Sequence, residues 1–157
     1  MSMFCYQCEQ ATKGVGCSEF GICGKDPETA ALQDLLIYGV KGLSQYAHRL
    51  RGLGVVDREI DVFNAEVLFT TVTNVNFDPE RLVVMARELA ELRDRTKARY
   101  AEAYAAKHGA PPEPVVGPAS WTPADTRDGL VQQGREVGIL AQFDRFGKDI
   151  TALLDLI

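Results

Sequence analysis

All of the cysteines in this 157-residue chain lie close together near its N-terminus. There are four, with the spacing C-x2-C-x8-C-x5-C: Cys5, Cys8, Cys17 and Cys23. Glycines lie within and just after the same stretch, at Gly14, Gly16, Gly21 and Gly24. Four thiols in a short glycine-rich loop are typical of a site for a metal ion or an iron–sulfur cluster. The sequence therefore predicts a metal- or cluster-binding loop over residues 1–25.

The cysteine spacing bears on which group the loop binds. Four thiolates can complete a tetrahedral zinc site or hold the corners of an iron–sulfur cubane. Structural zinc sites usually combine two C-x2-C pairs, whereas this loop has one, at Cys5 and Cys8. One close pair, two separated cysteines and flexible glycines suit a larger group, because backbone N–H groups can then approach its sulfides. The spacing favours an iron–sulfur cluster and leaves zinc, disulfides or free thiols as alternatives.

The residues around the loop are suited to an anionic group. Lys13 and Lys25 add positive charge, and a helix is predicted to begin directly after the last cysteine. The N-terminus of a helix carries partial positive charge and favours a nearby anion. Phe4 and Tyr6 are expected either to shield the site from water, which would tune its potential, or simply to pack within the loop.

Three amphipathic helices are predicted to follow the loop. Asp26-Pro27-Glu28 gives an N-cap and a proline at the first helical position, and this helix ends at Gly52 and Gly54. A second helix follows Asp57 and covers about 58–75. A third begins at Asp78-Pro79-Glu80 and runs to about His108. Short connections between such helices favour an antiparallel three-helix bundle over residues 26–109.

The last part of the chain is predicted to begin a second helical unit. Residues 110–121 form a proline-rich linker, with Trp121 anchoring it to the bundle. A helix is expected over 123–137, capped by Thr122 and closed by Gly138, and a last one from about 146–149 to Ile157. Residues 151–157 resemble 30–36 near the start of the first helix, either by chance or because a repeat begins there. We therefore expect an all-α fold in which residues 122–157 start a second bundle that is truncated.

Composition excludes several classes of partner. The net charge is -5 and there is no basic stripe, which argues against nucleic acid or an anionic membrane as a partner. No apolar run approaches the roughly 20 residues that span a bilayer, and Met1 to Phe4 lack the features of a signal peptide. We expect a cytoplasmic protein, where clustered cysteines serve as ligands more often than as disulfides. The sequence shows no catalytic constellation.

The cysteine loop and its flanks resemble the start of the hybrid cluster proteins, also called hydroxylamine reductases or prismane proteins. The resemblance rests on Phe4–Gln10, the glycine-flanked Cys17, Cys23–Lys25, Glu28–Ala30 and Leu32–Leu36. It continues through Thr71–Asn76, Trp121-Thr122 and Val137–Leu140, and so covers essentially the whole chain.

This resemblance implies a cofactor and an activity. In that family the N-terminal domain is all-helical and contains two three-helix bundles. The spacing resembles that of the class in which all four cysteines bind a 4Fe-4S cubane, which implies Cys5, Cys8, Cys17 and Cys23 as ligands here. A class with longer spacing binds 2Fe-2S. The family reduces hydroxylamine to ammonia, and is also associated with nitric oxide reduction, at a second, hybrid iron–sulfur–oxygen cluster.

The chain departs from the family pattern at that second cluster. Its ligands lie in later domains, and no cysteine follows Cys23 here. We therefore expect the N-terminal electron-transfer portion of an oxidoreductase, inactive alone, whose partners are the missing C-terminal domains and a redox electron donor. Two alternatives are a zinc-stabilised helical interaction module without redox activity and a free-standing ferredoxin-like carrier.

Overall fold

The computed structural model describes residues 3–72 and 76–155, and within them the fold is all-α. The elements in chain order are η1 (Thr12–Gly14), α1 (Pro27–Gly52), α2 (Arg58–Thr71), α3 (Pro79–His108), η2 (Gly117–Ser120), α4 (Arg127–Val137), α5 (Ile139–Phe146) and α6 (Lys148–Asp155). The described residues contain no strand, and one isolated β-bridge joins Cys5 to Cys17. The predicted fold class is confirmed.

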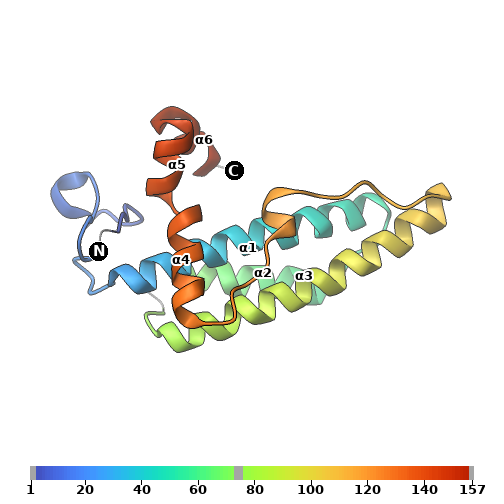
Figure 1. Ribbon diagram of the computed structural model, residues 1–157, viewed down its shortest axis with the longest axis horizontal. Helices are drawn as coiled ribbons and strands as arrows, with labels where there is room; N and C mark the ends of the chain where they lie inside the picture. The colour runs from blue at the N-terminus through green and yellow to red at the C-terminus, as the bar shows by residue number, and fades with distance from the viewer. Residues whose placement is uncertain (1–2, 73–75, 156–157) are drawn as a thin grey trace.

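Helices α1, α2 and α3 form the main bundle, in which α2 runs opposite to α1 and α3 (Figure 1). Their apolar faces meet in one core, whose fully buried side chains include Leu32, Leu35, Leu36, Leu43, Ile60, Val67, Leu82 and Leu89. Helix α1 contributes half of these residues and packs against both of the other helices. It also begins directly after the cysteine loop, so the bundle fixes the base of that loop.

The predicted helix starts are confirmed for the three long helices. The Asp26 carboxylate accepts a hydrogen bond from the Thr29 N–H at 2.7 Å. Asp57 accepts from the Glu59 N–H at 2.9 Å, and Asp78 from the Glu80 N–H at 3.0 Å. Each carboxylate satisfies an N–H group that has no partner inside its helix.

Helix α2 ends earlier than predicted. Its last residue is Thr71, and Val72 is already extended, with ψ at 144°. The Thr70 and Thr71 hydroxyls donate to carbonyls within the last turn, at Glu66 and Leu68. Threonine side chains that bond to the backbone in this way weaken a helix end. The predicted extension over 73–75 lies outside the described residues.

The segment after α3 returns along the bundle (Figure 1). Trp121 anchors its end, as predicted: the ring is buried in the main core, and its Nε1 donates to Gln133 Oε1 at 3.2 Å. The Trp121 carbonyl accepts a hydrogen bond from the buried Arg93 guanidinium. The linker approaches α1 so closely that a Cβ at Gly42 would lie 2.7 Å from the Pro118 carbonyl carbon.

Helix α4 begins four residues later than the predicted start at 123, and its cap is Thr126 instead of Thr122. The Thr126 hydroxyl accepts from the Gly129 N–H at 3.1 Å. The Gln133 side chain holds the preceding residues in a non-helical path. It donates to the Thr122 carbonyl at 2.8 Å and accepts from the Ala124 N–H at 3.0 Å. The residues around position 122 do not predict this contact, because Gln133 lies farther along the chain, within α4.

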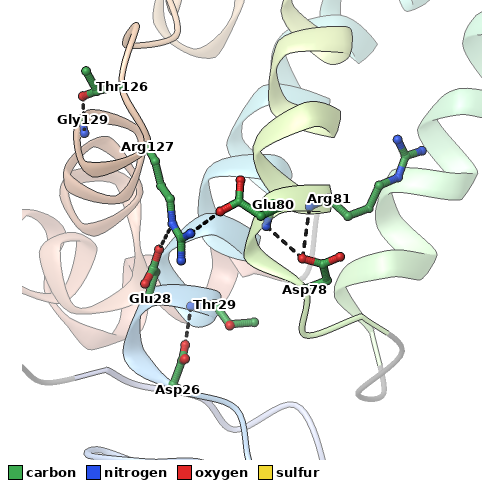
Figure 2. Close-up of polar contacts among 9 residues, drawn as sticks. All are labelled: Asp26, Glu28, Thr29, Asp78, Glu80, Arg81, Thr126, Arg127 and Gly129. Atoms are coloured by element: carbon green, nitrogen blue, oxygen red, sulfur yellow. Dashed lines mark hydrogen bonds and ion pairs between the residues drawn. The ribbon is translucent and has the colours of Figure 1, made fainter.

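Helix α4 crosses α1 and closes the start of the bundle (Figure 1). Arg127, its first residue, lies between two carboxylates and forms ion pairs with Glu28 of α1 and Glu80 of α3 (Figure 2). Both glutamates lie in the first turn of their helices, after the Asp26 and Asp78 caps. The two Asp-Pro-Glu motifs are therefore held together by one guanidinium.

Helix α5 was not predicted. Gly138 closes α4, as expected, but it is also the N-cap residue of α5, without any side-chain hydrogen bond. Gly147, at φ 77°, separates α5 from α6, which begins within the expected range. Residues 156–157 lie outside the described part of the chain. The boundary of a second bundle at residue 122 stays a prediction.

None of the helices in the described ranges combines the length and apolar character needed to cross a bilayer.

Candidate metal centre

Cys5 and Cys17 lie opposite each other on two short antiparallel segments. The Cys5 N–H donates to the Cys17 carbonyl at 3.0 Å, and the Cys17 N–H donates to the Cys5 carbonyl at 2.8 Å. Side chains of directly opposite residues lie on the same face, with Cβ atoms about 5 Å apart. The backbone thus brings these two predicted ligands together against Met3 and Ala30 in a small core.

A tight turn between the two cysteines places further donors at Cys17. In η1, Lys13 and Gly14 adopt positive φ values of 57° and 68°, which reverses the chain after Cys8. The Thr12 hydroxyl then donates to the Cys17 sulfur at 3.5 Å. This bond, a backbone N–H bond from Ile22 and the positive charge of Lys25 lower the pKa of the Cys17 thiol, against the opposing effect of burial. Cys17 is therefore predisposed to the thiolate that a metal needs.

The second half of the loop folds back around Gly21. The Gly21 N–H donates to the Lys25 carbonyl at 2.8 Å, and the Gly24 N–H donates to the Gly21 carbonyl at 2.9 Å. The turn is tight at Gly21, because a Cβ there would lie 3.0 Å from the Cys23 sulfur and 3.0 Å from the Lys25 Cβ. This turn positions Cys23 next to the Ile22 N–H, which points at Cys17.

Lys25 extends into the loop from the residue before the α1 cap. Its side chain is only 2% exposed. The ammonium lies 3.8 Å from the Cys5 sulfur and 3.2 Å from Gln7 Oε1, and 6.0 Å from the centre of the Phe77 ring. The predicted positive charge near the cysteines is thus in direct contact with one of them.

The four cysteines form no disulfide, and their donor chemistry fits a thiolate-bound group. The geometry fits only in part. Over residues 3–72 and 76–155, no group of three or more Cys, His, Asp or Glu side chains is arranged to hold a metal ion. The structure brings Cys5 and Cys17 together and does not gather Cys8 and Cys23 with them. The assignment of all four as ligands stays a prediction.

Three aromatic side chains pack together beside the loop. The Phe4 ring packs at 5.7 Å from the Tyr6 ring and at 5.8 Å from the Phe143 ring of α5. Sequence reasoning identified Phe4 and Tyr6 but missed Phe143, because it did not predict α5. It also missed Thr12, whose role depends on the positive-φ turn that follows it.

An open groove of about 810 Å³ runs from the cysteine loop along α1 to the chain's last helices. Its lining includes Cys5, Gln7 and Lys25 at the loop end, and Val137 and Leu154 at the far side. The Gln33 side chain, 2% exposed, also lines the groove; its Nε2 donates to the Asn76 carbonyl at 2.9 Å. Within the described residues its Oε1 has no hydrogen-bond partner.

Comparison with known proteins gives one consistent family. The hydroxylamine reductase of Rhodospirillum rubrum is 56% identical over 155 residues, which cover 99% of this chain and 28% of that protein. The hydroxylamine reductase of Geobacter metallireducens is 54% identical over 140 residues, 88% of this chain and 26% of the relative. That of Halothermothrix orenii is 45% identical over 158 residues, 100% of this chain and 28% of the relative.

These alignments define what part of the relatives the chain represents. The chain spans only about 28% of the length of the relatives it matches, and corresponds to their N-terminal portion. The sequence profile of the prismane/CO dehydrogenase family matches residues 3–157, which is nearly the entire chain. The chain with this cysteine loop and helical bundle therefore belongs to the prismane/CO dehydrogenase family.

Proposed function

We propose that this chain is the N-terminal electron-transfer portion of a hydroxylamine reductase. In this proposal, Cys5, Cys8, Cys17 and Cys23 hold a 4Fe-4S cluster. A bound cluster of this kind takes up and releases one electron. The observation that carries the proposal is the paired arrangement of Cys5 and Cys17 in a loop that holds all four cysteines.

The chain's own residues support thiolate ligation at this loop. The Thr12 hydroxyl and the Ile22 N–H donate to the Cys17 sulfur, and hydrogen bonds to cluster sulfurs tune iron–sulfur potentials. Phe4, Tyr6 and Phe143 pack together beside the loop. Joining the remaining two thiols to the site requires Cys8 and Cys23 to move, and the glycines at 14, 21 and 24 make both turns pliable.

The proposed substrate is taken from the names of the relatives. They carry the name hydroxylamine reductase, and the reaction is a two-electron, two-proton reduction of hydroxylamine to ammonia and water. Nitric oxide is a second candidate substrate. No cysteine follows Cys23, so we propose that the hybrid cluster forms in the later domains and that this chain supplies electrons to it.

Two partners belong to this proposal, the C-terminal domains of the same enzyme and a redox electron donor. The 810 Å³ groove supports the first partner, because it is lined by the cysteine loop and reaches α6. On α6, Ile150 and Leu153 are largely exposed. Apolar surface of this kind is normally covered by protein. A cytoplasmic location is part of the proposal, because clustered cysteines in a reducing compartment serve as ligands more often than as disulfides.

Anaerobic reconstitution tests the cluster. The purified chain is incubated with iron, sulfide and a thiol reductant, and its metal, sulfide and electron paramagnetic resonance spectrum are then measured. We expect about four iron and four sulfide per chain and a signal that forms on reduction with dithionite. About two of each would indicate 2Fe-2S. One tightly bound zinc ion without sulfide would overturn the proposal in favour of the zinc-stabilised module.

A single substitution provides the internal control. Cys17→Ser removes the thiol that Thr12 and Ile22 contact and should abolish cluster loading. Circular dichroism should show that most of the helix content remains, because the core of α1 to α3 does not include the loop. Full loading of Cys17→Ser would exclude Cys17 as a ligand.

A further inference from the structure

Lys25 is buried without a carboxylate partner. Its side chain is 2% exposed, and within the described residues it forms no ion pair with Asp or Glu. Its polar contacts are the Cys5 sulfur and the Gln7 amide oxygen. A buried ammonium is costly unless an opposite charge compensates it. The group that it contacts and that can carry negative charge is the Cys5 thiol.

The position of Lys25 is set by the fold. Its carbonyl accepts from the Gly21 N–H, and the next residue, Asp26, caps α1. Phe77, from the connection before α3, lies beside the ammonium. Lys25 is therefore held between the loop, the start of α1 and the start of α3. Lys13, the other lysine of the loop, is exposed to solvent.

Nearby carboxylates have other contacts. Asp26 is engaged with the Thr29 N–H. Asp34, which lines the same groove, lies against the α4–α5 junction, since a Cβ at Gly138 would lie 3.4 Å from the Asp34 Cγ. Among the described residues, the polar contacts of the Lys25 ammonium thus lie on the cysteine side of the loop.

We propose that Lys25 is the buried counter-charge of the cysteine site, which stabilises the anionic, reduced form of a cluster bound there and so raises its reduction potential. This inference rests on the proposed function. One-electron reduction by a donor such as dithionite adds one negative charge to the site. A fixed cation in a poorly solvated position favours the more negative state, because Coulomb attraction is weakly screened there. Lys25 acts on the cluster through its charge and takes no part in the chemistry of the substrate.

The test is the midpoint potential of the reconstituted chain. Dithionite titrations followed by electron paramagnetic resonance are compared for wild type, Lys25→Met, Lys25→Gln and Lys25→Arg. We expect a negative shift of the midpoint in both neutral variants and a return toward the wild-type value in Lys25→Arg. Lys13→Met is the matched control: it removes an exposed lysine of the same loop, and its shift should be much smaller because water and salt screen that charge.

Each outcome has one meaning. Unchanged midpoints in fully loaded Lys25→Met and Lys25→Gln would overturn the inference and leave the proposed function intact. Failure of both neutral variants to retain iron and sulfide, with retention in Lys25→Arg, would support it, because the charge is then needed to hold the anion. A wild-type chain that takes up no sulfide would instead reject the proposed function.

Discussion

Asp57 shows how a single side chain can serve two roles. Its carboxylate caps α2 through the Glu59 N–H and forms an ion pair with Arg99 of α3. The Arg99 hydrogen bond is the main reason that the pKa of Asp57 falls below its ordinary value of 3.8. A carboxyl whose pKa is lower in the folded state stabilises the fold above its unfolded pKa. That contribution is lost as the pH falls through the folded value.

Replacement of Asp57 by Asn isolates the charge, because asparagine is also a good N-cap. We expect Asp57→Asn to lower the free energy of unfolding by less than about 1 kcal/mol at pH 7. The difference from wild type should shrink as the pH is lowered below 3.8 and the wild-type carboxyl becomes protonated. Urea unfolding at several pH values measures it. A difference that stays constant down to pH 2 would show that charge is not the cause.

At the same scale, the sequence identified the cysteines but not their arrangement. Residue types and spacing were enough to select the four thiols, Lys25 and the two aromatic residues of the loop. The contact between Thr12 and Cys17 depends on positive φ values at Lys13 and Gly14. A lysine with a positive φ is rare, and the residues around Lys13 do not predict it. The contact between Lys25 and Phe77, which is distant in sequence, also could not be read from a local pattern.

At the scale of the helices, α4 crosses α1 with their backbones in close contact. Gly134 of α4 lies on the α1 backbone, and a Cβ there would lie 2.6 Å from the Ala31 carbonyl carbon. Backbone atoms on both sides leave no flexible side chain to move aside. Leu130 and Val131 of α4 join the main core beside this point. The absence of a side chain at position 134 therefore decides how deeply α4 packs.

Gly134→Ala should lower the free energy of unfolding by about 1–3 kcal/mol, the usual cost of overpacking, although alanine is the better helix former. Gly52→Ala is the matched control in a helix, because no atom lies within 4 Å of a Cβ at that position. It should leave stability unchanged or slightly raised. Urea unfolding of both variants decides the matter: equal stability would mean that α4 does not rely on close contact at Gly134.

Helix boundaries were predictable where they depend on neighbouring residues. The three aspartate caps are local, and all three were found. The start of α4 was wrong because Gln133 reaches back to bond with Thr122 and Ala124. Helix α5 was missed because Gly138 ends one helix and begins the next, and a glycine in that position normally indicates only an end.

At the scale of the whole molecule, the chain covers about 28% of the length of the relatives it matches. A family assignment drawn from the cysteine loop was confirmed over residues 3–157. The proposal that a hybrid cluster forms in later domains stays a prediction.

We expect the purified 157-residue chain, after reconstitution, to show no hydroxylamine reduction above the rate of buffer with the same iron and sulfide. The physical reason is that this chain has no cysteine after Cys23 to hold a second cluster. Ammonia formation under reduced methyl viologen measures the activity. Steady turnover with many product molecules per chain would show that the N-terminal portion contains an active site of its own.

The two Arg127 ion pairs can form only late in synthesis, because Glu28 and Glu80 both precede Arg127 in the chain. Arg127 and Glu28 are 99 residues apart in the chain. At a translation rate of about 5–20 residues per second, Arg127 is made roughly 5–20 s after Glu28. The cysteine loop and the first turn of α1 therefore emerge from the ribosome well before the arginine that ties α1 to α3. If the proposed cluster is inserted during synthesis, it enters a loop whose supporting helices are not yet joined by Arg127, and α4 docks on α1 only afterwards.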